Sequence, residues 1–300
     1  MTGLLGGAPG SGAALAERFA AGEMVLAPGC YDALGARLIE EAGFAAAYMT
    51  GFGSSAARLG RPDVGLLTLT EMVDNARRIA GAVAIPVIAD ADTGYGNPLN
   101  VIRTVHEYAA AHVAAIHIED QVTPKKCGHM DDKQLIGADE MVAKVSAAVA
   151  ARGDGGMLII ARTDARAVEG LEAALERARR YRAAGADVLF VEAPQSTEEI
   201  ERIASTFPDV PLLFNYAEGG KTPAVSRDFL RDLGFGLVIF PLSLLLKATE
   251  AMRSVLAQIR ADGTPGALLP SRLGFSEFLD LIGAAEIGDL ERRFADPEPA

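Results

Sequence analysis

The sequence predicts an α/β protein with a (β/α)8 barrel (TIM barrel) fold. Eight short apolar runs recur along the chain, and most of them end at a polar residue or a glycine. Segments with apolar residues at helical spacing separate most of these runs. Short apolar runs are typical of parallel strands covered on both faces, and eight strand–helix repeats fit the ~250 residues of such a barrel. A doubly wound open sheet is the structural alternative.

The expected elements follow one another along the chain. The predicted strands are 24–29, 45–51, 86–92, 114–120, 157–164, 187–193, 211–218 and 237–243. The helical pattern is clear after Thr70, a candidate N-cap, and in the segment that ends near Gly185, a candidate C-cap. Residues 1–12 predict a loose arm, and residues 275–294 have helical spacing. Because no low-complexity linker interrupts the chain, we expect residues 1–300 to form a single domain.

Composition excludes several classes of protein. The chain has 28 Lys and Arg against 40 Asp and Glu, a net charge of −12, which argues against a general nucleic-acid or anionic-membrane binder. Two cysteines are too few for a disulfide framework. The N-terminus lacks the pattern of a secretory signal, and no run of about 18 apolar residues is free of charge. We therefore expect a soluble cytoplasmic protein with no nucleic-acid or membrane partner.

Polar and ionisable residues stand at the ends of many consecutive predicted strands, where barrel enzymes place their catalytic groups. Contact with water explains one or two such residues but explains the whole set less well. The set is Tyr48, Asp90, Asp92, Glu119, Asp120, Arg162, Asp164, Glu192, Asn215 and Ser243.

Acidic residues form the first candidate centre. Asp90 and Asp92 are two residues apart, a spacing that on a strand puts both carboxylates on one face. Glu119 ends the next predicted strand, and Asp63 lies in a loop after the second. Clustered carboxylates repel one another unless a proton or a cation intervenes, and oxygen ligands suit Mg²⁺ or Mn²⁺. Helix caps or salt bridges are the alternative use of these residues. The histidines between Asp90 and Glu119, which are His106, His112 and His117, are expected to be structural.

The polar segment 121–133 follows Glu119 and predicts a loop over the barrel mouth. It carries Cys127 beside lysines and His129. A free thiol, with a pKa near 8.5, is mostly protonated at neutral pH, so Cys127 could donate a proton as well as act as a nucleophile. An incidental exposed thiol is the alternative. No lysine lies in a predicted strand, which counts against Schiff-base chemistry and favours metal-assisted carbanion chemistry.

The motif GFGSSA at 51–56 is similar to a dinucleotide-binding fingerprint, and a nicotinamide-linked oxidoreductase would depend on it alone. No convincing helix follows it. We predict instead a glycine-lined turn whose N–H groups hold a substrate carboxylate or carbonyl.

Four motifs together resemble the isocitrate lyase/phosphoenolpyruvate mutase superfamily over about residues 20–290. They are DADTGYGN, EDQVTPKKCGH, IARTDA and NYAEGGKTP. The KKCGH motif is similar to the carbon–carbon lyase branch of that family. The resemblance implies a Mg²⁺-dependent (or Mn²⁺-dependent) enzyme in a barrel whose eighth helix is swapped between subunits of a dimer of dimers, a homotetramer. The C-terminal segment, about 270–294, could supply that helix.

The resemblance also implies a role for each matching residue. Asp90 and Asp92 are the metal-binding pair, with Glu119 and Asp63 acting mostly through metal-bound water. Cys127 is the catalytic acid on a mobile loop, and the base is Tyr48 or a metal-bound water. Glu192, which would act through Cys127 or water, and His129 complete the catalytic set. The substrate-binding set is Gly51, Phe52, Gly53, Ser54, Arg162, Asn215 and Ser243.

One departure from the family pattern bears on the substrate. Tricarboxylate lyases of the family carry an arginine where this chain has Leu246, which favours a 2-hydroxydicarboxylate such as 2,3-dimethylmalate. Arg272 could still hold the third carboxylate of a methylisocitrate-like substrate. Either would be cleaved by a retro-aldol reaction to an α-keto acid such as pyruvate and a carboxylate. Oxaloacetate hydrolysis or decarboxylation is the alternative. A non-catalytic binding barrel is disfavoured by the joint presence of the metal and loop residues.

Overall fold

The computed structural model describes residues 10–128, 130, 132–266 and 273–295. Its centre is a single parallel sheet with strand order β6-β5-β4-β3-β2-β1-β8-β7. A bridge between Leu189 in β6 and Leu212 beside β7 brings the two ends of the sheet together, so the sheet is a nearly closed barrel. The strands are β1 Val25–Cys30, β2 Ala47–Met49, β3 Val87–Asp90, β4 Ala115–Glu119, β5 Leu158–Thr163, β6 Val188–Val191, β7 Leu213–Asn215 and β8 Leu237–Phe240. Each overlaps one of the eight predicted runs, so the predicted barrel is confirmed and the open sheet is excluded.

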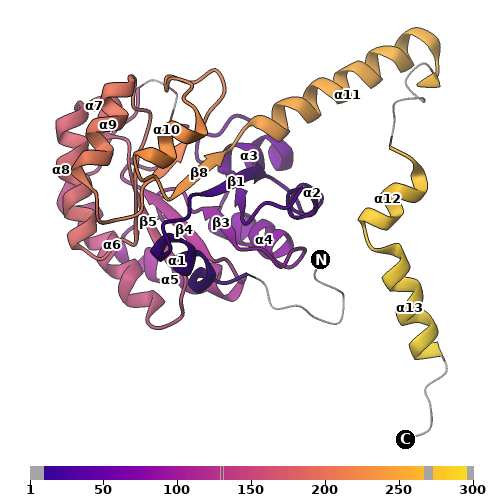
Figure 1. Cartoon of the computed structure of the whole chain (residues 1–300), viewed down its shortest axis with the longest axis horizontal. Coiled ribbons are helices and arrows are strands. Elements are labelled where there is room, and N and C mark those ends of the chain that lie inside the picture. Colours follow the sequence, from indigo (N-terminus) through magenta and orange to yellow (C-terminus); the bar gives the residue numbers. More distant parts are fainter. Residues whose placement is uncertain (1–9, 129, 131, 267–272, 296–300) are drawn as a thin grey trace, which may run out of the picture.

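Helices surround the barrel and extend beyond it (Figure 1). They are α1 Gly12–Ala20, α2 Ala33–Glu41, α3 Gly51–Leu59, α4 Leu69–Ala80, α5 Pro98–Ala110, α6 Ala138–Arg152, α7 Ala165–Val168, α8 Leu171–Ala183, α9 Thr197–Thr206, α10 Arg227–Asp232, α11 Ser243–Asp262, α12 Phe275–Leu281 and α13 Ala284–Ala295. The predicted cap of α4 is wrong by two residues, because Thr68 and Glu71 form a capping box that starts the helix earlier. Gly185 follows α8 with φ 102°, a conformation that favours glycine.

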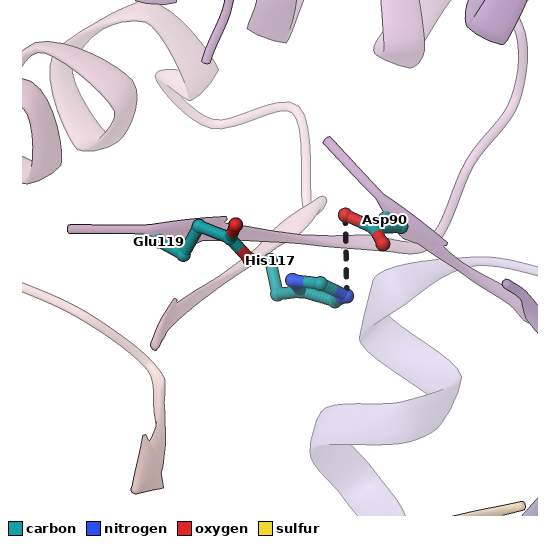
Figure 2. A group of neighbouring side chains, drawn as sticks. All are labelled: Asp90, His117 and Glu119. Carbon is teal, nitrogen blue, oxygen red and sulfur yellow. Dashed lines mark ion pairs between the residues drawn. The ribbon is translucent and has the colours of Figure 1, made fainter. Parts of the chain in front are cut away.

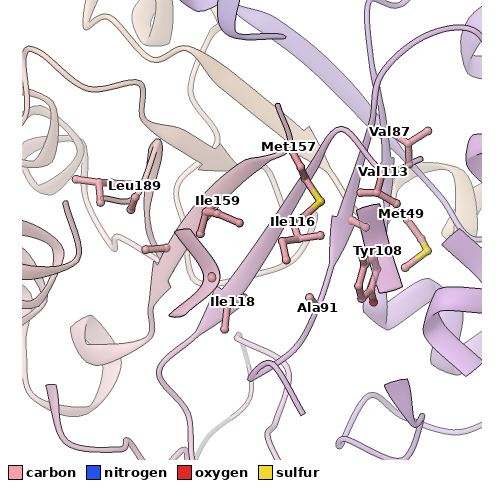
Figure 3. Close-up of a cluster of buried hydrophobic side chains, with 14 of the residues drawn as sticks. Met49, Val87, Ala91, Tyr108, Val113, Ile116, Ile118, Met157, Ile159 and Leu189 are labelled. Atoms are coloured by element: carbon pink, nitrogen blue, oxygen red, sulfur yellow. The ribbon is translucent and has the colours of Figure 1, made fainter. Parts of the chain in front are cut away.

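The alternation of side chains along each strand divides the core into two layers. The outer layer packs strand residues such as Ile116, Ile118 and Ile159 against the helices (Figure 3). The inner layer fills the barrel, and Leu15 of α1 belongs to it. In β4 this alternation points Ala115, His117 and Glu119 inward, because Ile116 and Ile118 face the helices. The fold therefore carries polar side chains into the barrel interior.

The C-terminal helices leave the barrel. α11 projects outward, and α12 and α13 lie apart from the strands (Figure 1). No residue of α11 is buried, and large apolar side chains are exposed along it, such as Leu256 at 65%. In the described part of the chain, no helix is both long and apolar enough to cross a membrane.

Candidate active site

A small cavity of about 40 Å³ lies at the carboxyl ends of the strands. Eight of the predicted site residues line it: Tyr48, Phe52, Asp63, Asp90, Cys127, Arg162, Glu192 and Asn215. A larger cavity of about 580 Å³ lies at the opposite end of the barrel beside α1. We place the chemistry at the smaller cavity, because barrel enzymes carry their catalytic groups at the carboxyl ends of the strands.

Asp90, His117 and Glu119 form the first polar group of the site (Figure 2). One ligand atom of each lies within 4.8 Å of the others, an arrangement that could hold a metal ion. His117 Nε2 lies 2.8 Å from the Tyr48 hydroxyl and 3.6 Å from Asp90 Oδ1. Burial lowers the pKa of His117 to about 4, so its imidazole is neutral at pH 7. We expected His117 to be structural; its spacing of two residues from Glu119 was the signal that it shares the inner face.

Asp63, Asp92 and Lys125 form the second group. The Lys125 ammonium lies 2.7 Å from Asp63 Oδ2 and 2.8 Å from Asp92 Oδ1, and its side chain is 4% exposed. Burial raises the pKa of Asp92 to about 6 in spite of that ammonium. Sequence reasoning missed this role of Lys125, because the contact joins residues 62 positions apart.

The predicted strand geometry of the acidic pair is wrong. β3 ends at Asp90, and Asp92 adopts φ 48°, beyond the strand. The Asp92 N–H donates to Asp90 Oδ1 over 2.9 Å, so a tight turn separates the two carboxylates instead of a shared strand face. The four predicted metal ligands are thereby divided between the two groups.

The donor set nevertheless fits a hard divalent cation. Four buried carboxylates converge on one end of the barrel, and oxygen ligands of this kind are those that Mg²⁺ and Mn²⁺ prefer. Burial holds the pKa of Glu119 well above its usual range in spite of the nearby Arg162 and Lys125, so its negative charge would gain from a further cation. The Lys125 ammonium between Asp63 and Asp92 shows that a cation is accommodated there.

Arg162, at the end of β5, is fixed on several sides. Its Nε and Nη2 donate to Asp164 over 2.9 and 3.0 Å, and its guanidinium lies 3.2 Å from Glu119 Oε2 and 3.3 Å from Glu192 Oε2. Its guanidinium carbon also lies 5.1 Å from the centre of the Phe190 ring. The arginine is therefore preorganised at the cavity wall, where it can face a substrate carboxylate.

The prediction for residues 51–54 requires correction, because they form the first turn of α3 instead of an open turn. The Thr50 side chain caps this helix, and the N–H groups of Gly53 and Ser54 are bonded to Thr50. A Cβ atom on Gly51 would lie 2.2 Å from Asp90 Oδ2, so only glycine permits this approach. Ser54 is buried and accepts a hydrogen bond from Asn75, away from the cavity. Of these four residues, Phe52 lines the cavity.

Of the remaining predicted residues that the structure describes, Ser243 lies away from the cavity. The Ser243 hydroxyl bonds to Glu218, and Ser243 lines an outer groove instead of the cavity. His129 and Arg272 lie outside the described residues. Leu246, which we used to infer the substrate, lies on α11 at 48% exposure and does not line the cavity. Its bearing on substrate choice therefore remains a prediction.

Sequence reasoning also missed an apolar wall of the cavity. Phe190, Ala217, Ile239, Pro241 and Leu242 line it together with the charged residues. Such a wall suits the alkyl groups of a small organic acid. The signal for it was the apolar character of the last strand ends, which is indistinguishable from core packing in a sequence.

Residues 15–260 match the family described as phosphoenolpyruvate phosphomutase. The chain is 47% identical to 2,3-dimethylmalate lyase of Eubacterium barkeri, across 94% of this chain and 98% of that protein. It is 45% identical to 2-methylisocitrate lyase of Aeropyrum pernix, across 95% of this chain and 90% of that protein. The solved structure of oxaloacetate acetylhydrolase with 3,3-difluorooxalacetate matches with a TM-score of 0.90 and 36% identity, covering 95% of this chain and 98% of that chain. The similarity extends over the barrel and the cavity.

Proposed function

Because the chain belongs to the phosphoenolpyruvate mutase/isocitrate lyase superfamily, we propose that it is a metal-dependent carbon–carbon lyase that cleaves a 2-hydroxydicarboxylate such as 2,3-dimethylmalate. The observation that carries the proposal is the meeting of Arg162, Cys127 and the acidic residues at one cavity. Relatives named as 2,3-dimethylmalate lyase and 2-methylisocitrate lyase support the class of substrate.

The site offers a place for each part of the substrate. Arg162 binds the carboxylate of the α-hydroxy acid end, since Asp164 holds its guanidinium in place. Asp90 would hold Mg²⁺, with Asp92, Glu119 and Asp63 around it, and the ion would stabilise negative charge on the substrate oxygen. The apolar wall receives the alkyl groups.

The chain's own residues move the protons. Burial raises the pKa of Tyr48 well above its usual value, so its phenol stays protonated and donates a hydrogen bond instead of acting as the base. The hydroxyl proton therefore passes to the acidic cluster. The C2–C3 bond then breaks, its electron pair stays on C3, and the Cys127 thiol protonates C3. The products are an α-keto acid and a saturated carboxylate.

A parallel assay tests this function. Metal-free protein is supplied with Mg²⁺ or Mn²⁺ and given 2,3-dimethylmalate, 2-methylisocitrate, isocitrate and oxaloacetate in separate reactions, with α-keto acid release as the readout. We expect pyruvate from 2,3-dimethylmalate, and we expect Cys127→Ser to lose most turnover while it still binds pyruvate. Near-normal turnover by that variant would refute the acid role of Cys127.

Oxaloacetate hydrolysis is the second candidate, because the solved oxaloacetate acetylhydrolase resembles this chain closely. The same α-oxyacid end would bind to the same residues. Direct detection of oxalate from oxaloacetate, with no cleavage of the hydroxy acids, would make oxaloacetate hydrolysis the preferred function.

We further infer that the C-terminal helices complete the barrel domain of another copy of this chain, within a homo-oligomer. An apolar groove of about 380 Å³ runs outside β1 and β8, lined by Leu26, Leu38, Phe44, Phe240 and Leu244. The exposed apolar side chains of α11, α12 and α13 match it in character. The molar mass in solution, measured by light scattering, tests this; a monomer would refute it, and a tetramer would fit a dimer of dimers.

A further inference from the structure

We propose that Gln121 and Lys133 are positioning residues that hold Cys127 at the cavity from both sides. The inference rests on the proposed role of Cys127 as the acid. Cys127 lies in the segment of residues 121–128, which follows β4. The peptide groups on either side of Cys127, at Lys126 and Gly128, are each held by one buried side chain.

Gln121 holds the residue before Cys127. Its carboxamide donates from Nε2 to the Lys126 carbonyl over 2.8 Å and accepts at Oε1 from the Lys126 N–H over 3.0 Å. One side chain thus bonds both backbone polar groups of Lys126, as a neighbouring strand would. The same Nε2 also donates to Glu119 Oε1 over 3.0 Å, which ties Gln121 to the first polar group. Gln121 is 1% exposed, so these bonds are shielded from water.

Lys133 holds the residue after Cys127. Its ammonium donates to the Gly128 carbonyl and to Asp164 Oδ1, the latter over 2.9 Å. The side chain is 1% exposed, and a buried ammonium is tolerated only with such partners. Asp164 also holds Arg162, so a single carboxylate aligns the arginine and, through Lys133, the segment that carries the thiol.

Gly128 fits closely against the site. A Cβ atom there would lie 2.4 Å from Arg162 Nη2 and 2.7 Å from Glu192 Cγ. The backbone next to Cys127 therefore lies directly on the two charged residues of the cavity wall. Because the contact is so close, Gly128 sets how near the backbone beside Cys127 lies to the cavity wall.

The base of the segment is fixed independently of these two side chains. The Val122 N–H donates to the Gln134 carbonyl over 2.8 Å, and Gln121 pairs with Leu135 in an isolated antiparallel bridge. Loss of the Gln121 or Lys133 side chain therefore leaves the barrel and this pairing intact. The Cys127 N–H still donates to the Asp63 carbonyl over 3.2 Å, so we expect the variants to loosen the thiol and not to release the whole segment. A change confined to the thiol distinguishes a positioning role from a folding role.

The rate at which iodoacetamide alkylates Cys127 tests the proposal without any substrate. Cys30, the other cysteine, is buried and its pKa is raised far above its usual value by burial, so it does not contribute. We expect Lys133→Met and Gln121→Leu to be alkylated at least about tenfold faster than the unmodified chain, since each loses a shielded hydrogen bond. Lys133→Arg keeps both donors and is expected to restore most of the protection.

Arg152→Met is the matched control. Arg152 bridges the Asp187 carboxylate and the Met157 carbonyl as Lys133 bridges Asp164 and Gly128, but at the opposite end of the barrel. We expect it to leave the alkylation rate unchanged. Unchanged alkylation in folded Lys133→Met and Gln121→Leu, checked by circular dichroism, would overturn the proposal. If the unmodified protein cleaves none of the substrates but the two variants are still alkylated faster, the positioning role of Gln121 and Lys133 is supported and only the lyase function is refuted.

In an active enzyme, the same variants should lower kcat at least about tenfold while KM changes less, because Arg162 still binds the substrate. An equal loss in the Arg152→Met control would point to general destabilisation and overturn the positioning role.

Discussion

Asp92→Asn should make the metal-free protein more stable at neutral and alkaline pH. Burial raises the pKa of Asp92 from 3.8 to about 6, which means that ionising this carboxyl costs more in the folded than in the unfolded chain. Asparagine resembles the protonated acid and avoids that cost. A difference of about two units corresponds to about 3 kcal/mol in the free energy of unfolding at pH 8.

The pH dependence fixes the sign of this effect. The folded chain binds more protons at Asp92 than the unfolded chain between about pH 4 and pH 6, so the cost is relieved as the pH falls through this window. The advantage of Asp92→Asn should therefore fall to about half by pH 5 and nearly vanish at pH 4. The depressed pKa of His117 acts in the opposite direction over the same range, but it is common to both proteins and cancels in their difference.

Urea unfolding in EDTA, at pH 5, 6.5 and 8 and at one fixed protein concentration, measures this difference. Asp209→Asn is the control, because Asp209 is exposed and Arg182 lowers its pKa, so its loss should bring no gain at pH 8. Mg²⁺ should stabilise the unmodified protein and have a smaller effect on Asp92→Asn. Equal or lower stability of Asp92→Asn at pH 8 would refute the reasoning that burial makes ionised Asp92 costly in spite of its contact with Lys125.

Three further outcomes are expected. Arg162→Lys loses the paired contact with Asp164 and should raise KM at least about tenfold in steady-state kinetics; an unchanged KM would contradict its role as carboxylate ligand. Gly128→Ala should lower kcat about 100-fold with little change in the unfolding midpoint, since the new methyl group meets Arg162. An unchanged kcat would show that residues 121–128 can shift to accept the methyl group without loss of activity. Leu256→Glu places a charge on the exposed apolar face of α11 and should reduce the molar mass measured by light scattering; an unchanged mass would exclude this face from the interface.

The sequence was sufficient to predict the barrel, because each strand is a short apolar run between polar ends, and that pattern depends on the strand alone. Its predictions failed where the local preference of a segment is overridden by its surroundings. The glycine-rich residues 51–54 have low helix propensity, yet α3 starts there because Thr50 caps it. Gly51 is required for a different reason, since Asp90 leaves no room for a side chain at that position. Asp92 likewise leaves the strand pattern, since its N–H is held by Asp90.

The sequence placed eight of the predicted site residues at the cavity, but not Gly51, Gly53, Ser54 or Ser243, and it did not indicate which residues pair with one another. Strand ends placed the carboxylates, Arg162 and Glu192 at one end of the barrel, as expected from topology. The partners of these residues depend on the path of the segment after β4. Nothing in the sequence of residues 125–133 indicates that Lys125 contacts Asp63 and Asp92 while Lys133 contacts Asp164.

These partners link the charge of the site to the position of the thiol. The buried carboxylates of the site need positive charge, and two of the cations that supply it lie on either side of Cys127 in the chain. Lys125 pairs with Asp63 and Asp92, and Lys133 pairs with Asp164. Packing Cys127 against the cavity and compensating the carboxylates are therefore one event, driven by the same ion pairs. A divalent cation at Asp63 and Asp92 would compete with Lys125 for the same oxygens. By linkage, whatever strengthens metal binding there must weaken the Lys125 contacts by an equal free energy. The thiol is then held by Gln121, by Lys133 and by the bond from the Cys127 N–H to the Asp63 carbonyl.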